Sequence, residues 1–292
     1  MMRPKYLPFM DGWRLALGLK PLAFAEWIEI DQTFVEQVTL KHTLLTERHN
    51  QVFASLPGSQ VAQQEVLDTL VAHLLEHFPQ YYQRQGDRLY NTLIHQSWNL
   101  NDFKENPLDL AGRLVQEDLC LMLPSDRGYS LSAASVCFPS RWRLQEKMGQ
   151  PITSIHEHIP DYPSKLERPV DQFFDRLKVE HPGYRLNWSL VDTPKLFLAD
   201  AAPMVLSSQA TRENLGKHLW LRVERQTLRR MPISDTVLFT IRSYLHPLEQ
   251  LVADRDVAEK LAIAIQQMPA AMQAYKSISP VRSMLLEYLE QG

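Results

Sequence analysis

Two histidines separated by one residue form the part of the sequence best suited to hold a metal ion or a haem iron. His156 and His158 lie in a segment stiffened by Pro151, Pro160 and Pro163, and a stiff loop holds a ligand at low entropic cost. If this segment is extended, the two imidazoles point the same way, and either can ligate iron through a neutral nitrogen. A pair of surface histidines beside a helix start is the alternative, and the residues alone do not separate the two.

A second candidate is the unusual charge pattern between residues 219 and 230. Arg222, Glu224 and Gln226 share one face of the expected strand because alternate residues of a strand face the same way. If that face is solvated, as we expect from the sequence alone, it carries only weak ion pairs. If it is buried, it forms a polar network able to bind propionates, a carboxylate or a substrate amine.

Three other motifs carry less chemistry. His73, Glu76 and His77 match the H-x-x-E-H string of inverted zinc peptidases, but their place beside an apolar helical stripe favours a solvated helix face. Cys120 and Cys137 lie on expected strands and are typical of small buried hydrophobic residues, with a thiolate haem ligand as the alternative. The sequence contains no G-x-S-x-G elbow and no glycine-rich phosphate loop.

Composition excludes several classes of function. The chain has 292 residues, 31 basic and 34 acidic, and 45% of its residues are hydrophobic, as in an ordinary globular protein. No net positive charge favours nucleic acid or an anionic membrane surface, and no stretch approaches the ~18–20 apolar residues of a membrane helix. We see no signal peptide, and two cysteines are too few for a disulfide scaffold. We therefore expect a cytoplasmic protein with reduced thiols that binds neither nucleic acid nor membrane.

The elements that position these residues follow from hydrophobic spacing. Residues 1–30 are apolar and interrupted by Pro and Gly, which predicts an arm laid over a core. Asp31 is placed to cap a helix, and a second helix follows Pro57. The expected buried residues of these two helices are Phe34, Val35, Val38 and Leu45 in the first, and Leu67, Leu70, Val71, Leu74, Leu75 and Phe78 in the second.

The middle of the chain has the period of strands. A turn-rich stretch at residues 124–128 predicts a hairpin, and a helix carrying Phe173, Phe174 and Leu177 interrupts the later strands. Two helices, at residues 247–267 and 270–290, end the chain. The expected strands are residues 118–123, 129–138, 184–191, 219–228 and 237–245. This order predicts one α+β domain over residues 1–292, built on an antiparallel sheet with flanking N- and C-terminal helices.

Several short strings, taken in order, resemble the haem-dependent oxidative N-demethylase alpha-subunit family. They extend from about residue 8 to residue 242, which is most of the chain, and their number and order make the match specific. They are residues 8–10, 18–19, 27–29, 116–122, 155–156, 160, 162, 169–170, 185–188, 221–232 and 239–242.

This resemblance implies a PAS-like five-stranded antiparallel sheet that binds haem. It also implies an enzyme that uses O₂ to demethylate a small secondary or tertiary methylamine, releases formaldehyde, and receives electrons from separate flavin and iron–sulfur reductase components. His156 stands in the Ile-His position of the family string and is the implied iron ligand. His158 departs from the family pattern, which leaves the assignment open between the two histidines.

The haem hypothesis also assigns roles by residue type. A carboxylate is needed to relay protons to the reacting centre, and guanidinium groups match haem propionates. The relay candidates are Glu117, Asp118 and Glu224, and the candidates for holding the cofactor are Arg222, Arg225, Gln226 and Arg242.

Two other function classes fit the same sequence. A PAS-like haem or ligand sensor needs the fold and the ligand but no turnover. A protein that has kept the fold and lost the cofactor needs only the fold. Because a sensor usually signals to an effector domain and this chain has no room for a second recognisable one, we expect the enzyme.

Overall fold

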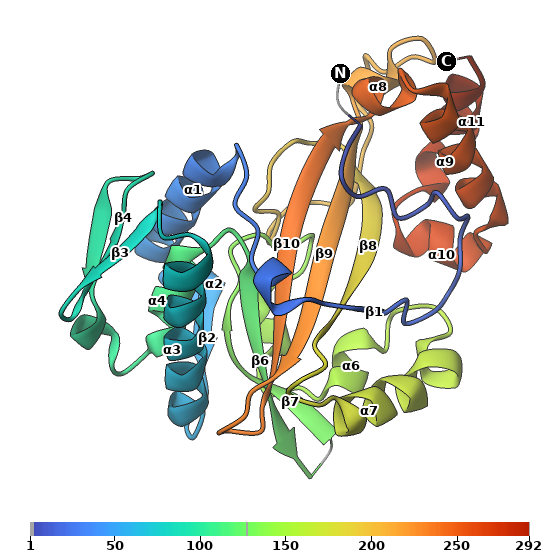
Figure 1. Cartoon of the computed structure of the whole chain (residues 1–292). Coiled ribbons are helices and arrows are strands. Elements are labelled where there is room, and N and C mark those ends of the chain that lie inside the picture. Colours follow the sequence, from blue (N-terminus) through green and yellow to red (C-terminus); the bar gives the residue numbers. More distant parts are fainter. Residues whose placement is uncertain (1–2, 127, 292) are drawn as a thin grey trace.

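A seven-stranded antiparallel sheet forms the centre of the fold (Figure 1). It belongs to a computed structural model that describes residues 3–126 and 128–291. In sheet order the strands are β1 (Lys20–Pro21), β8 (Gly183–Val191), β9 (Trp220–Arg230), β10 (Val237–Pro247), β6 (Asp118–Ser125), β7 (Gly128–Ser135) and β2 (Phe53–Ser55).

The five long strands confirm the predicted sheet, and the mixed α+β fold class is confirmed with them. β6 and β7 form the expected hairpin; its turn includes Arg127, which lies outside the described residues. The two edge strands, β1 and β2, were not predicted, because two or three residues are too few to show alternation. A separate small sheet was also missed; its strands are β3 (Tyr82–Gln85), β4 (Arg88–Asn91) and β5 (Gln96–Asn99).

One face of the sheet, which we call the arm face, carries Leu119, Leu121 and Leu238 and is covered by the N-terminal part of the chain. The arm (residues 3–33) crosses this face, as predicted, and buries Trp27 and Ile28 (Figure 1). The covering helices are η1 (Phe24–Glu26), α1 (Phe34–Glu47), α2 (His49–Val52), α3 (Gln60–His77), η2 (Leu100–Phe103) and α4 (Pro107–Leu114).

The two predicted N-terminal helices are confirmed as α1 and α3, with one correction. Phe34, Val38 and Leu45 of α1 are buried, whereas Val35 is 46% exposed. Positions 34, 38 and 45 share one stripe of a helix, and position 35 is rotated about 100° away from position 34. Val35 is therefore an exposed apolar residue and not part of the core.

The opposite face, which we call the α6 face, carries Cys120, Leu228 and Val237 and is covered by the segment from residue 140 to 178. The segment expected to be an extended loop is instead a short helix followed by turns, because Pro151 stands at the N-cap of α6 and proline suits that end of a helix. The helices here are α5 (Leu144–Lys147), α6 (Ile152–His156), η3 (Tyr162–Leu166) and α7 (Glu167–Arg176).

The C-terminal helices pack beside β8 and β9 around Leu221, Val223 and Leu261. Two long helices were predicted here, and the structure divides them, because Asp254 caps a new helix and Pro269 begins another. The elements are η4 (Leu215–Lys217), α8 (Leu248–Val252), α9 (Arg255–Gln267), α10 (Ala270–Tyr275), η5 (Ser279–Val281) and α11 (Arg282–Gln291). Within residues 3–126 and 128–291, none of the helices has both the length and the apolar character needed to cross a membrane.

Candidate functional site

A polar patch interrupts the apolar α6 face. It consists of Arg185 and Asn187 on β8 and Glu224 and Gln226 on β9, which are paired directly, Arg185 with Gln226 and Asn187 with Glu224. Residues directly opposite each other in an antiparallel pair project from the same face. All four are half-buried, so the expectation of a solvated strand face is wrong.

His156 is the last residue of α6, and one of its ring nitrogens is free to bind a ligand. Its Nδ1 donates a hydrogen bond to the carbonyl of Ile152 over 3.0 Å, while Nε2 has no hydrogen bond to any described residue. Burial lowers the pKa of His156 to about 4, although the bond to Ile152 opposes this shift and the charge of Arg185 adds to it. The imidazole is therefore neutral at pH 7, with its lone pair on Nε2.

His158 has different surroundings. It lies in the turn after α6, and its ring is 5.9 Å from that of Tyr275 on α10, whereas the ring of His156 is 5.2 Å from that of Tyr162. The helical geometry of residues 152–156 removes the extended segment that would have aligned the two imidazoles. The structure thus gives the two histidines separate partners.

Arg185 has no hydrogen-bonded partner among the described residues. Its Nε is buried without a hydrogen-bond acceptor, and the guanidinium makes no hydrogen bond or ion pair within the described part of the chain. Burial lowers the pKa of Arg185, while the charge of Glu224 opposes this effect. Burying a charged donor without an acceptor lowers stability. The lack of an acceptor for Arg185 Nε therefore indicates that a ligand could supply one.

Glu224 is held by the two amide side chains of the patch. Its Oε2 accepts hydrogen bonds from Asn187 Nδ2 at 3.3 Å and Gln226 Nε2 at 2.9 Å. Its Oε1 is 3.8 Å from Arg222 Nε. The predicted grouping of Arg222, Glu224 and Gln226 on one face is therefore present in the structure.

Lys276 completes the patch and was not predicted. It follows α10, and its Nζ donates to Asn187 Oδ1 at 2.9 Å and to the Trp188 carbonyl at 2.5 Å. Burial lowers the pKa of Lys276 to about 8, although the charge of Glu224 opposes the shift. The residue is 89 positions from Asn187 in the sequence, and only the tertiary fold brings the two together.

Arg222 is fully buried, and both terminal nitrogens of its guanidinium donate hydrogen bonds. Its guanidinium donates to the carbonyl oxygens of Phe138 and Leu196 and to Ser243 Oγ. These bonds tie β9 to two loops at one end of the α6 face. Arg222 therefore lies on the expected face, with its side chain bonded to the chain itself.

Arg225 and Arg242 lie on the arm face, away from His156. Arg225 donates to the carbonyl oxygens of Glu26 and Trp27, and Arg242 pairs with Asp31 at 2.8 Å. The two residues are directly paired across β9 and β10, and successive residues of a strand face opposite sides. The structure does not bring these two arginines together with the polar patch.

Glu117 and Asp118 are also separate from the patch. Glu117 is fully buried and accepts a hydrogen bond from the backbone N–H of Glu29 at 3.1 Å. Asp118 accepts hydrogen bonds from the backbone N–H groups of Cys137 and Phe138 at 2.8 and 2.9 Å. Burial raises the pKa of both carboxyl groups.

The other histidine motif does not form a metal site. His73 is 7% exposed and packs against Trp27 and His77, with ring centroids 5.1 and 4.5 Å away, so the expectation of a solvated position for it is wrong. No group of three or more His, Cys, Asp or Glu side chains in the described residues could hold a metal ion. Cys120 and Cys137 are buried and unpaired, as predicted.

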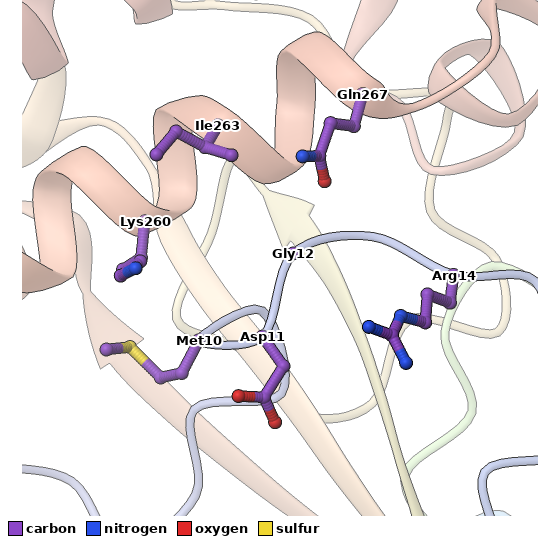
Figure 2. A pocket seen from close by; sticks show the side chains of 7 residues that line it. All are labelled: Met10, Asp11, Gly12, Arg14, Lys260, Ile263 and Gln267. Atoms are coloured by element: carbon purple, nitrogen blue, oxygen red, sulfur yellow. The ribbon is translucent and has the colours of Figure 1, made fainter.

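A groove of about 420 Å³ lies elsewhere, between the arm and α9 (Figure 2). Figure 2 shows the side chains of Lys260, Ile263 and Gln267 on α9 beside arm residues 10–14. Gln267 Oε1 accepts a hydrogen bond from the backbone of Trp13 at 3.1 Å. None of the predicted site residues lines this groove, so it stands apart from the polar patch.

Comparison with known protein families gives one match. The family model described as haem-dependent oxidative N-demethylase, alpha subunit-like, matches residues 18–286. This range includes α6, the polar patch, the arm-face network and Lys276. The match confirms the resemblance drawn from the ordered strings, and it covers more than half of the chain. The chain therefore belongs to the haem-dependent oxidative N-demethylase, alpha subunit-like family.

Proposed function

We propose that the chain binds haem through His156 and takes part in the oxidative N-demethylation of a small secondary or tertiary methylamine. The observation that carries this proposal is the state of His156, whose Nδ1–H is engaged by Ile152 and whose Nε2 is free. A ligating histidine characteristically donates its other ring N–H to a carbonyl or carboxylate, which fixes the tautomer and the ring orientation.

The residues around His156 fit a haem. Apolar side chains of the α6 face and its cover, including Ile152, Phe174 and Leu228, suit the macrocycle, and the polar patch suits its charged groups. His158 lacks the hydrogen bond to a carbonyl that His156 makes. We therefore assign the iron to His156 and treat His158 as the control.

The proposed reaction determines which chemical groups the site must contain. Bound haem provides the redox chemistry with O₂, and the overall change consumes the N-methylamine, O₂, two electrons and two protons and yields the demethylated amine, formaldehyde and water. Glu224 is our choice for the proton relay because its carboxylate is half-buried on the α6 face and held by Asn187 and Gln226. A positioned carboxylate of this kind can pass a proton to a reacting group.

The remaining predicted residues receive a supporting role in this proposal. Glu117, Asp118, Arg222, Arg225 and Arg242 spend their hydrogen bonds on the chain's own backbone or side chains. We propose that they hold the arm and the loops against the sheet. Glu224 and Gln226 are then the only ones of the predicted patch residues left to face a ligand.

The family name describes an alpha subunit, and this supports partner chains. We propose that electrons arrive from separate flavin and iron–sulfur reductase components docked on the surface. We also propose that β7, β6, β10, β9 and β8, which are adjacent in that order, are the PAS-like sheet, and that residues 1–292 act as one haem-binding domain with helical extensions.

Haem titration of the purified chain tests the cofactor. We expect a Soret band that shifts on reduction with dithionite and again with CO. His156→Ala is expected to lose or reshape this spectrum, and His158→Ala is expected to leave it nearly intact. The opposite result for the two variants would move the ligand to His158, and no Soret band in any of the proteins would refute the haem proposal.

Turnover is tested separately. The haem-loaded chain is supplied with reduced flavin and iron–sulfur carrier, O₂ and dimethylamine, and formaldehyde is measured. We expect formaldehyde release that depends on haem and falls at least about tenfold in Glu224→Gln. Haem binding with no turnover of any methylamine would favour a PAS-like sensor over the enzyme.

A further inference from the structure

We infer that Arg185 binds a carboxylate of a molecule that enters the site, and that this carboxylate is a propionate of haem. The inference rests on the proposed function and adds a cofactor-binding residue to it. The observation behind it is a half-buried arginine on the α6 face whose Nε is buried and whose guanidinium donates no hydrogen bond to any described residue.

The other buried arginines of the sheet make Arg185 an exception. Arg222, Arg225, Arg230 and Arg242 each donate hydrogen bonds to carbonyl, carboxylate or amide oxygens of the chain. These bonds compensate the cost of burying their charge. Arg185 donates no such bond to any described residue, and the charge of Glu224 acts on it without a hydrogen bond.

Arg229 also has a buried Nε without an acceptor, but its charge has another partner. Its guanidinium carbon lies 4.7 Å from the ring centre of Trp27 and 4.9 Å from that of Phe24. Both distances are within the range of a cation–π interaction. Arg185 makes no such contact with an aromatic ring in the described structure, so its guanidinium is available to an external partner.

The charges around Arg185 favour an anion as that partner. Arg222 and Lys276 carry positive charge beside the patch; Glu224 interacts with all three cations, and Asp118 interacts with Arg222 as well. Glu224 already accepts hydrogen bonds from Asn187 and Gln226. The patch therefore keeps an excess of positive charge, and a guanidinium matches a carboxylate through paired N–H donors.

The position of Arg185 relative to His156 indicates which carboxylate binds. Arg185 lies on the sheet face that α6 covers, His156 is the last residue of α6, and the charge of Arg185 lowers the pKa of His156. A haem held by His156 would carry its propionates into the surroundings of that imidazole together with the iron, whereas a substrate would bind as a separate molecule. A cation close to the imidazole therefore suits the propionate better than a carboxylate on an N-methylated amino acid.

The test compares haem with haem dimethyl ester, in which the propionates are esterified. Titration of the wild-type apoprotein is expected to show about 10- to 100-fold weaker binding of the ester, as for loss of a hydrogen bond to a charged group. Arg185→Gln is expected to bind haem more weakly by a similar factor and to bind the two forms equally well. Arg185→Lys keeps the charge and is expected to lose less affinity.

Arg229→Gln is the matched control, because it removes a buried guanidinium of the neighbouring strand from the arm face. We expect it to discriminate between haem and its ester as the wild type does. Circular dichroism of each variant checks folding, and the ester experiment on the wild-type chain needs no variant. If Arg185→Gln discriminates between haem and the ester as the wild type does, the propionate assignment is overturned.

A second experiment distinguishes the two possible sources of the carboxylate. If Arg185→Gln binds haem normally but raises the KM for N,N-dimethylglycine without changing the KM for dimethylamine, Arg185 binds a substrate carboxylate and the propionate assignment is wrong. If neither haem affinity nor KM changes, the whole inference is wrong and the proposed function stands. If the wild-type chain binds no haem, both fail together.

Discussion

Two arginines on the arm face and one arginine on the α6 face differ in whether the chain itself accepts their hydrogen bonds. On the arm face, Arg225 and Arg242 are bonded to Glu26, Trp27 and Asp31 of the arm. On the α6 face, Arg185 and the Nε2 atom of His156 have no hydrogen-bond partner among the described residues. The three arginines lie on the neighbouring strands β8, β9 and β10.

This difference indicates which buried polar groups stabilise the fold and which are available to bind a ligand. A buried charge that is fully hydrogen-bonded holds its segments together, and removing one partner leaves the other uncompensated. A buried donor or lone pair with no partner in the chain lowers the stability of the apoprotein and is available to a ligand. Arg225 and Arg242 accordingly hold the arm against the sheet through hydrogen bonds of their terminal nitrogens, whereas Arg185 makes no such bond within the described residues.

The largest effect is expected from breaking the buried ion pair that joins β6 to α1, one of the helices that cover the arm face. Asp118→Ala removes the acceptor of two backbone N–H groups and leaves Lys41, fully buried and 3.7 Å from Asp118, without its carboxylate. We expect a loss of about 3–5 kcal/mol in the free energy of unfolding, measured by urea denaturation of the apoprotein.

Asp126→Ala is the control for that experiment, because Asp126 is exposed in the turn between β6 and β7. Its effect is expected to stay within about 0.5 kcal/mol. An Asp118→Ala protein as stable as this control would mean that the buried pair with Lys41 does not support the fold.

The next prediction compares one arginine from each face. Arg225→Met removes two hydrogen bonds to arm carbonyl groups and is expected to destabilise the apoprotein by about 1.5–3 kcal/mol. Arg185→Met removes a charge that has no hydrogen-bonded partner among the described residues. We expect unchanged or higher apoprotein stability, because an apolar side chain replaces this charge. Haem affinity is expected to fall only in Arg185→Met.

The outcome that contradicts this comparison is equal destabilisation by the two variants. It would mean that Arg185 is satisfied within the folded chain. Urea denaturation at fixed pH and salt measures both proteins, and Leu186, which is paired with Arg225 across β8 and β9, supplies a Leu186→Met variant as a control for side-chain replacement at this place in the sheet.

Much of the fold could be predicted from local pattern. The alternation in β6 to β10 and the helical spacing in α1 and α3 are properties of short segments, and they gave the five long strands and both helices. β1 and β3 to β5 could not be found this way, because strands of two to four residues with mostly polar side chains have no readable period. The positions of these strands depend on the segments of the chain that pack against them.

The candidate site was predicted less completely. His156, Glu224 and Gln226 were found because their types and spacing are visible in one segment, and the burial of the β9 face was misjudged because it depends on residues 140–178 covering it. Arg185 belongs to one of the strings that match the family, but no ligand-binding role was predicted for it or for Lys276. Nothing in either segment indicates a missing acceptor or a contact made 89 positions away, since both are properties of the packed chain.

The smallest predicted effect compares a histidine from each face. Burial lowers the pKa of both His73 and His156 to about 4, whereas an unfolded histidine takes up its proton near pH ~6.5. Between these values the unfolded chain holds more protons than the folded chain, so stability falls as pH decreases from about 6.5 to 4. Each histidine contributes no more than ~1.4 kcal/mol per pH unit to this slope.

His73→Gln and His156→Gln are each expected to flatten the dependence of the unfolding free energy on pH in the apoprotein, measured by urea denaturation at several pH values. The two variants are expected to differ once haem is present. His73→Gln keeps wild-type haem binding, because His73 packs against Trp27 on the arm face, while His156→Gln loses it. If both variants lost haem, the site would extend across the sheet, and the separation of its two faces into a structural and a ligand-binding side would be wrong.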